Sequence, residues 1–190
     1  MTVKPLEKRF SDERIRRSIA RILRENVLCS MSTVSPGNRP HVNTAYFCHT
    51  PDLEFYFLSD PSSQHCRNLE RNASLAMTIF RSAQVWGGPD RGLQLFGTCR
   101  RTRGRRAREA ERCYAARFSP YAKWMEGLSP AERRQAALLR SYAFYRFLPR
   151  RIKILDEREF GGAMFVTAAV VRGPNSRTVV HWSATERLSP

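Results

Sequence analysis

The sequence predicts a mainly β protein of the α+β class, an antiparallel β-barrel with an N-terminal helix and peripheral helices. Two observations lead to this fold class. Three strand-like runs follow one another over 27–59 and are joined by short turns, so the sheet begins as an antiparallel meander. The strand-like segments come in runs, and a short helix after residue 60 is the one helical pattern between the N-terminal helix and those over 105–140; this segregation argues against the alternating order of a βαβ fold.

The length of 190 residues suits one domain around one buried core. We expect a flexible arm over 1–10, the domain over 11–172, and a tail over 173–190 in which only 178–182 is strand-like. No segment has the roughly 20 apolar residues of a membrane span, and the N-terminus lacks an apolar signal segment. We therefore expect a cytoplasmic protein with no membrane partner.

The first element is a helix from Ser11 to about Asn26. Ser11 can cap it, acidic residues occupy its first turn, and isoleucines and a leucine recur at helical spacing on one face. The apolar period then changes to two, and turns rich in proline, glycine and aspartate separate the strands that follow. These three strands are expected over 27–34, 40–49 and 53–59.

The remaining elements mix short helices and strands. Asp60-Pro61 ends the third strand, and a short helix follows it to about Glu70. Ser129, Pro130 and Glu132 have the spacing of a capping box and predict another helix start. The other expected elements are strands over 74–80, 92–101, 142–148, 152–155 and 164–171, and a helix over 105–117.

The junction between the third strand and the short helix, residues 59–69, is the candidate functional segment. Ser62 or Ser63 can cap the helix, whose first N–H groups and positive dipole end suit an anion. Serine hydroxyls donate well to phosphate oxygens, and His65 and Arg67 can add charge. The alternative is that the serine only caps the helix and that His65 is a surface residue.

Three segments, in this order, resemble those of a known family. They are Pro40-His41-Val42-Asn43, Leu53-Glu54-Phe55-Tyr56-Phe57, and the run from Ser59 to Leu69. The stretch from Val27 to Phe80 is similar to the pyridoxamine 5'-phosphate oxidase-like superfamily of FMN-binding split β-barrels. The similarity continues through Arg91–Gly97 and covers roughly residues 12–102, while later segments resemble a small bacterial subgroup of this fold. The resemblance implies a six-stranded split barrel.

The resemblance also implies a cofactor, an assembly and an activity. FMN would lie in a cleft between the two subunits of a homodimer, and the protein would be an FMN-dependent oxidoreductase acting on a small molecule. The implied contacts are Val42, Asn43, Thr44 and Ala45 along the flavin ring, Ser59, Ser62, Ser63, Gln64 and His65 at the ribityl phosphate, and Gln94 and Arg91 from a neighbouring strand.

One difference from the family concerns the phosphate turn. Well-characterised oxidases of the family carry an Arg-Lys pair there, whereas the equivalent positions here are Ser63-Gln64, or Gln64-His65 if the alignment shifts by one. Losing two cations would weaken phosphate binding by about 2–4 kcal/mol, although Arg67, Arg71 or Arg91 could replace them. The superfamily also contains haem and deazaflavin binders, so a non-enzymatic protein that binds one of these is the alternative.

No catalytic residues stand out in the sequence. It has no Ser-His-Asp signature, paired-carboxylate motif, phosphate loop or dinucleotide glycine fingerprint. This fits a flavoprotein, in which the cofactor does the redox chemistry and the protein positions it. The five cysteines and four histidines show no metal-ligand spacing, so we expect no metal site.

A formal net charge of +16, mainly from arginine, is the most unusual bulk property. Eight arginines lie between Arg100 and Arg117. Such a face could track a nucleic-acid backbone, yet the nearby aromatic residues fall on the apolar side of the expected helix and not among the charges. We favour a biased composition and a solvated helix face over a nucleic-acid partner. Some of the arginines could attract an anionic small-molecule substrate.

Overall fold

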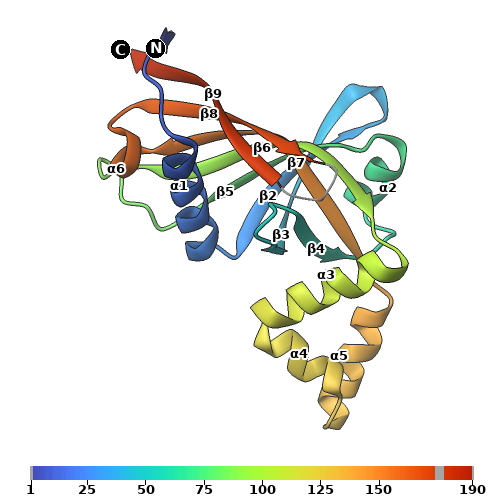
Figure 1. Cartoon of the computed structure of the whole chain (residues 1–190). Helices are drawn as coiled ribbons and strands as arrows, with labels where there is room; N and C mark the ends of the chain where they lie inside the picture. The colour runs from blue at the N-terminus through green and yellow to red at the C-terminus, as the bar shows by residue number, and fades with distance from the viewer. Residues whose placement is uncertain (1, 174–177, 190) are drawn as a thin grey trace. The chain divides into compact units, whose positions relative to one another are not determined.

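Strands make up more of the chain than helices in the computed structural model, which describes residues 2–173 and 178–189 (Figure 1). The strands are β1 (Thr2–Leu6), β2 (Leu28–Ser35), β3 (Arg39–His49), β4 (Phe55–Ser59), β5 (Ser74–Phe80), β6 (Arg91–Arg101), β7 (Ala143–Asp156), β8 (Met164–Arg172) and β9 (Thr178–Ser189). The helices are α1 (Asp12–Glu25), α2 (Gln64–Arg71), α3 (Gly104–Arg117), α4 (Ser119–Glu126), α5 (Pro130–Arg140) and α6 (Glu157–Phe160), with one tighter turn at Pro36–Asn38. Within the described residues, no helix is long and apolar enough to span a membrane.

The strands form the split β-barrel that the sequence predicts. They hydrogen-bond in the order β1-β9-β8-β7-β4-β3-β2-β5-β6, and β7 also pairs with β6. The additional pairing closes β2 to β7 into a ring of six strands, as expected. The pairs β3–β4, β4–β7, β7–β8 and β8–β9 are antiparallel.

Contacts divide the described chain into two compact units. Unit 1 contains Met1–Met31, Ala76–Gly97 and Pro149–Pro190, and unit 2 contains Ser32–Leu75 and Thr98–Leu148. The strands β2, β5, β6 and β7 contribute residues to both units, so neither unit is continuous along the chain.

Helix α1 buries its apolar face in unit 1. The Ser11 hydroxyl accepts a hydrogen bond from the Arg14 N–H (3.3 Å), and Asp12 and Glu13 place negative charge in the first turn. The buried residues of the helix are Ile15, Ser18, Ile19, Ile22 and Leu23. The capped amphipathic helix expected at this position is confirmed.

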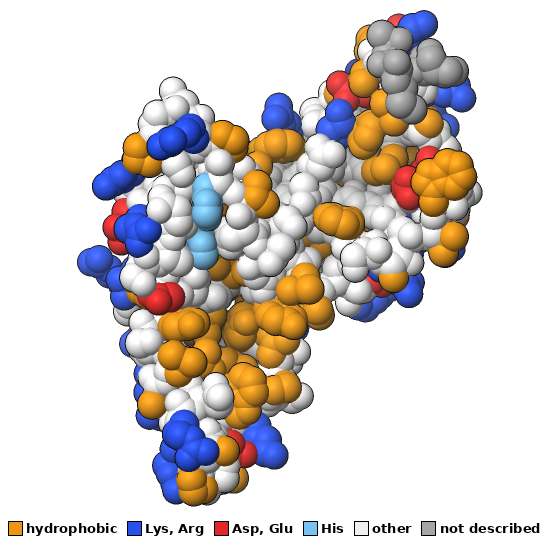
Figure 2. Space-filling view, turned by 180° about the vertical axis from the view of Figure 1, so that it is seen from behind, with side chains coloured by type: hydrophobic (Ala, Val, Ile, Leu, Met, Phe, Trp, Pro, Cys, Tyr) orange, Lys and Arg blue, Asp and Glu red, His pale blue; other side chains and the backbone are white. Residues whose placement is uncertain are grey.

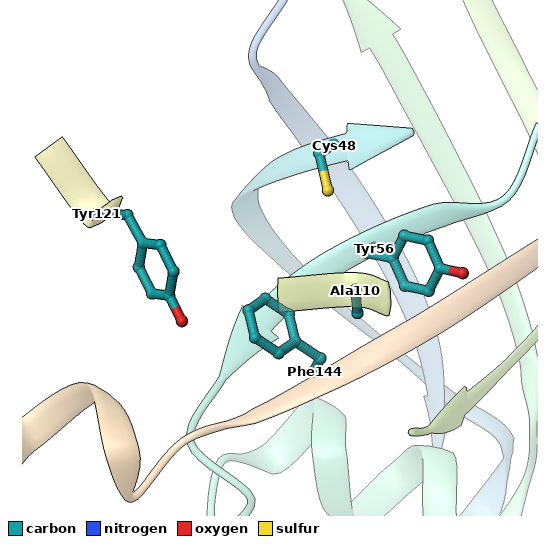
Figure 3. Close-up of a cluster of buried hydrophobic side chains, with 5 residues drawn as sticks. All are labelled: Cys48, Tyr56, Ala110, Tyr121 and Phe144. Atoms are coloured by element: carbon teal, nitrogen blue, oxygen red, sulfur yellow. The ribbon is translucent and has the colours of Figure 1, made fainter. Parts of the chain in front are cut away.

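Aromatic side chains fill the core of unit 2. Figure 3 shows a buried cluster to which β3, β4, α3, α4 and β7 each contribute one residue. Its members are Cys48, Tyr56, Ala110, Tyr121 and Phe144. The ring of Tyr114 packs edge to face against two rings of this cluster. Its centroid lies 5.1 Å from that of Tyr121 and 5.5 Å from that of Phe144.

The helical part of unit 2 is confirmed at α3 and α5 and differs from expectation between them. The Ser129 hydroxyl accepts from the Glu132 N–H (3.2 Å), and the Glu132 carboxylate accepts from the Ser129 N–H (2.8 Å), which is the predicted capping box. The sequence prediction named no separate helix at α4, which starts with Pro120 in its first turn.

Both ends of the chain differ from the prediction. Residues 2–6, expected in a flexible arm, form β1 and pair antiparallel with β9, from Thr2 opposite Ser189 to Leu6 opposite Thr185. The tail was expected to hold a strand only over 178–182, but β9 continues to Ser189, while 174–177 lie outside the described residues. The expectation was wrong because each of these strands is stabilised by a partner far away in the sequence.

Candidate functional site

Two hydroxyls and an imidazole converge in unit 2 where β4 ends and α2 begins. Ser59 Oγ lies 2.7 Å from His65 Nε2, and Ser63 Oγ lies 3.2 Å from the same nitrogen. The two hydroxyl oxygens are 3.5 Å apart. These three side chains, all predicted from the sequence, are called the Ser59–Ser63–His65 cluster below.

The turn before α2 is held by Asp60. Its carboxylate accepts a hydrogen bond from the Ser62 N–H (2.7 Å), and its carbonyl oxygen accepts one from the Ser63 N–H (3.0 Å). Ser63 has the extended backbone of a helix cap, yet its hydroxyl makes no capping bond to α2. The hydroxyl is therefore available to His65 or to a ligand, and it does not satisfy the first N–H groups of the helix.

His65 is half-buried between two rings. The centroid of the Phe57 ring lies 6.3 Å from that of His65, and the His41 ring lies 6.5 Å away in a nearly parallel plane (12°). Burial, followed by repulsion from His41, lowers the pKa of His65 from its ordinary value of 6.5. His65 is therefore mostly neutral at pH 7, when its Nε2 can either donate or accept a hydrogen bond.

Gln64, a predicted phosphate contact, is engaged in holding α2. Its amide N–H donates to Asn68 Oδ1 (2.8 Å), and Asn68 donates to the hydroxyls of Thr33 and Ser35 (3.0 Å each). Asn68 and Thr33 are buried, so these hydrogen bonds satisfy groups that water cannot reach. They fix the helix, and with it the cluster, against the end of β2.

Three arginines could replace the missing Arg-Lys pair, and one of them is fixed at the turn. Arg67 donates to the Ser62 carbonyl oxygen, which holds its guanidinium beside the start of α2. Arg71 lies in the last turn of the helix, and Arg91 belongs to unit 1, where it forms an ion pair with Glu25 (2.8 Å). Unit 2 thus supplies one cation to the turn where the well-characterised oxidases have two.

The predicted ring-binding residues occupy β3 in the same unit. Val42 and Thr44 are exposed, whereas Asn43 and Ala45 are half-buried. The Asn43 Oδ1 atom is buried and has no hydrogen-bond partner among the described residues. Leaving a buried acceptor unsatisfied costs about 1–3 kcal/mol, so this atom would gain from a ligand that donates to it.

Arg91 and Gln94 lie on β6 in unit 1, apart from the other nine predicted contacts, which belong to unit 2. Both line a pocket of about 320 Å³ together with Asp90, Lys153 and Phe165, among others. Gln94 is exposed, while the side chain of Arg91 is held by its ion pair with a glutamate of α1. Arg91 and Gln94 therefore line a pocket of unit 1, and their contact with a flavin stays a prediction.

An aromatic pocket of about 420 Å³ in unit 2 was missed by the sequence prediction. Figure 2 shows hydrophobic side chains gathered over the helices α3 to α5. The lining residues are Tyr46, Leu58, Tyr114, Phe118, Pro120, Tyr121, Trp124, Leu139 and Tyr142. The helical spacing of Tyr114, Phe118 and Tyr121 was the signal that could have revealed it.

The described residues contain neither a disulfide nor a candidate metal site. All five cysteines are free thiols, and no group of three or more His, Cys, Asp or Glu side chains could hold a metal ion there. The interaction between Cys48 and Cys113 raises the pKa of the first thiol and lowers that of the second.

The lowered pKa of His65 predicts a pH dependence of stability. Below about pH 6.5 the unfolded chain gains a proton at this residue, while the folded protein resists protonation until its own lower pKa is reached. The stabilisation that neutral His65 contributes to the folded protein is therefore present above about pH 6.5. It is lost as the pH falls through the pKa of His65 in the folded protein. We expect the stability advantage of the wild type over His65→Gln, measured by urea unfolding, to shrink from about pH 7.5 to about pH 5.

His49 titrates in the same range, because burial also lowers its pKa. Its contribution cancels in this comparison, since both proteins contain it. A difference in unfolding free energy that stays constant with pH would contradict the assignment to His65.

Comparison with known proteins identifies a family over most of the chain. The family model described as pyridoxamine 5'-phosphate oxidase matches residues 15–156. Among curated proteins, none matches the sequence.

Solved structures share the fold at low sequence identity. A heme binding protein from Mycobacterium smegmatis has a TM-score of 0.62 and 13% identity, covering 85% of this chain and 59% of its own. A pyridoxamine 5'-phosphate oxidase-related, FMN binding protein from Nostoc punctiforme has a TM-score of 0.57 and 16% identity. The match covers 92% of this chain and 96% of the Nostoc protein. The heme storage protein HutZ from Vibrio cholerae has a TM-score of 0.51 and 17% identity. The match covers 70% of this chain and 88% of HutZ. The chain thus spans about three fifths of the mycobacterial protein, and at these low identities the structural similarity shows a common fold alone.

Proposed function

The chain belongs to the pyridoxamine 5'-phosphate oxidase family, and from this premise we propose that it is an FMN-dependent oxidoreductase acting on a small molecule. The observation that carries the proposal is the Ser59–Ser63–His65 cluster at the start of α2. FMN, when bound, would supply the redox chemistry, and the residues of this chain would bind and orient it.

The cluster fits a phosphate through its hydroxyl hydrogens. When His65 Nε2 carries a hydrogen, it donates to a serine Oγ, and the hydrogens of Ser59 and Ser63 are then free to point at an anion. The open first N–H groups of α2 and the guanidinium of Arg67 add donors and positive charge. Asp60 is exposed and opposes an anion, but its carboxylate is occupied by the Ser62 N–H.

On β3, Asn43 is the residue best suited to orient the ring. Its buried Oδ1 lacks a donor, and the edge of a flavin ring presents an N–H group that could supply one. We assign Val42, Thr44 and Ala45 to apolar and backbone contacts along the same strand. Gln94 and Arg91 remain proposed contacts from unit 1.

We propose that a second copy of the chain completes the flavin site. Val42 and Tyr46, two exposed residues on alternating positions of β3, are 65% and 54% accessible. Exposed apolar side chains that share one face of a strand are typical of a surface that another protein covers. Sedimentation equilibrium should give the mass of a dimer, and a monomer at all concentrations would contradict this assembly.

Serine substitutions in the cluster test the phosphate assignment. Ser59→Ala and Ser63→Ala should each weaken FMN binding by about fivefold, the effect of one lost hydrogen bond, and the double variant should weaken it further. The affinity is measured from the quenching of flavin fluorescence during titration. Ser74→Ala, at an exposed serine that begins β5, is the matched control. Equal affinities for the wild type and all four variants would contradict the assignment of the phosphate to this turn.

Haem is a second candidate, because His41 offers an imidazole on the same surface. Its ring is parallel to that of His65, and no hydrogen bond engages its side chain among the described residues. One accessible histidine is enough for an axial ligand to haem iron. A Soret band that shifts in His41→Ala would favour haem, while FMN binding should be little affected by this substitution.

A further inference from the structure

A basic pocket lies in unit 2 at the carboxyl end of α2. Its volume is about 270 Å³, and its lining residues are Leu69, Glu70, Arg100, Arg101, Arg103 and Tyr145. None of them belongs to the Ser59–Ser63–His65 cluster. Because Glu70 follows Gln64, the first residue of α2, by six positions, about 9 Å of helix separates the pocket from the turn. The pocket is therefore a feature separate from the proposed flavin-phosphate turn.

Two buried residues fix the arginine segment at the mouth of this pocket. The Cys99 N–H donates to the Ala73 carbonyl oxygen (2.8 Å), directly beyond α2. Thr102 donates its N–H (2.8 Å) and its hydroxyl (2.9 Å) to the carbonyl oxygen of Phe144, the neighbour of Tyr145. Since Cys99 and Thr102 are both buried, the backbone between and beside them is held at two points.

The three arginines of the pocket have no anionic partner in the part of the chain that the structure describes. Arg100, Arg101 and Arg103 are exposed, and none forms an ion pair with a described residue. On the adjoining helix α3, by contrast, Arg106 pairs with Glu109 at 2.9 Å. Glu70 is the carboxylate in the lining, so three guanidinium groups and one carboxylate leave two net positive charges.

Tyr145 contributes a buried hydroxyl without a partner. The residue is fully buried, and its hydroxyl oxygen makes no hydrogen bond within the described residues. Burial, followed by the neighbouring Cys66 thiol, raises the pKa of Tyr145, so the hydroxyl keeps its hydrogen. The charges of Arg101 and Glu70 act on the same hydroxyl, which indicates that all three groups are close together.

We propose that this pocket binds a small phosphate monoester as its dianion. A phosphate carries close to two negative charges at pH 7, which matches the net charge of the lining. Guanidinium groups donate in pairs to phosphate oxygens, and the Tyr145 hydroxyl can donate to a further one. Leu69 supplies an apolar wall for the carbon part of the ester. The carboxyl end of α2 opposes an anion, but its half charge is smaller than the excess of the arginines.

Isothermal titration of the full chain with inorganic phosphate tests the proposal. Arg101→Gln and Arg103→Gln should each weaken binding by about tenfold, the effect of one charge-assisted hydrogen bond. Arg108→Gln is the matched control, because it removes the same charge from an exposed position of α3 outside the pocket. His65→Gln is the second control, because it changes the flavin-phosphate turn and leaves the basic pocket intact.

Tyr145→Phe separates a ligand-binding role from a structural one. The substitution removes a hydroxyl that has no oxygen or nitrogen partner among the described residues and only the Cys66 thiol, a weak hydrogen-bonding group, beside it, so the midpoint of thermal unfolding without phosphate should fall little. Phosphate binding should nevertheless weaken by about fivefold, since the hydroxyl gains an oxygen partner only from the ligand. A large fall in the midpoint with unchanged phosphate affinity would overturn the role of Tyr145.

The other outcomes also decide the proposal. Equal losses in Arg101→Gln and Arg108→Gln would mean a general charge effect, as on a nucleic-acid-binding surface, and would overturn it. A loss confined to His65→Gln would place the phosphate at the turn of α2 and would overturn it as well. The absence of saturable binding at millimolar phosphate would do the same. None of these results depends on whether FMN binds.

Discussion

Replacing Asp156 by alanine is expected to lower the free energy of unfolding by about 3–5 kcal/mol. The carboxylate of Asp156 is fully buried in unit 1 and accepts hydrogen bonds from the Ser18 hydroxyl (2.7 Å) and the Arg21 guanidinium (2.6 Å). It also caps α6 by accepting from the Glu159 N–H (3.3 Å). The substitution would leave a buried hydroxyl unpaired and would remove the carboxylate whose hydrogen bond most raises the pKa of Arg21.

Glu186→Gln is the control for this effect. Glu186 accepts from Lys153 (2.5 Å) in the same unit, but both side chains are partly exposed, so the loss should stay below about 1 kcal/mol. Urea unfolding measured for the wild type and the two variants gives the comparison. Similar losses of unfolding free energy in Asp156→Ala and Glu186→Gln would show that the contribution of Asp156 to stability does not come from its burial.

Phe57→Ala is expected to destabilise unit 2 by a similar amount, about 3–5 kcal/mol. The Phe57 side chain is fully buried on β4, and its ring stacks on that of Tyr145 at 5.4 Å with nearly parallel planes (9°). Its ring also borders His65. The cavity left by alanine would remove packing from beneath the Ser59–Ser63–His65 cluster, so FMN binding should weaken together with stability.

Phe57→Leu is the matched variant, because it keeps most of the apolar volume and should cost about 1.5 kcal/mol or less. Urea unfolding and FMN titration of both variants check the expectation. If Phe57→Ala lost stability but bound FMN as tightly as Phe57→Leu, the packing beneath the cluster would not matter for the site.

The elements predicted correctly are those with a local cause. Helix α1 was predicted because Ser11, the acidic first turn and the isoleucine spacing all lie within one short stretch, and the structure shows that cap and that buried face. The capping box of Ser129 and Glu132 was predicted in the same way. Neighbouring residues are enough to stabilise features of this kind.

The elements missed are those whose partners are distant in the sequence. Strand β1 exists because Thr2 lies opposite Ser189, and no pattern within the first ten residues reveals such a partner. Pro149 interrupts the strand-like residues of β7, so two strands were predicted where the structure has one.

For the candidate site, the sequence predicted the turn but not its surroundings. The Ser59–Ser63–His65 geometry follows from a strand end at Ser59 and a helix start at Gln64, and local rules describe both. The fixed position of Arg67 and the unsatisfied oxygen of Asn43 depend on the folded chain. The basic pocket likewise required the approach of Tyr145 on β7 to the arginines at and just beyond the end of β6.

The most direct test of FMN binding at this site is an absorption spectrum of the purified protein. The spectrum is recorded after incubation with FMN and removal of free flavin by desalting. We expect flavin absorption to stay with the wild-type protein and to be lost to a large extent in the Ser59→Ala, Ser63→Ala double variant. Wild-type protein that emerges without flavin absorption, or that shows a Soret band after incubation with haem instead, would contradict the assignment of this site to FMN.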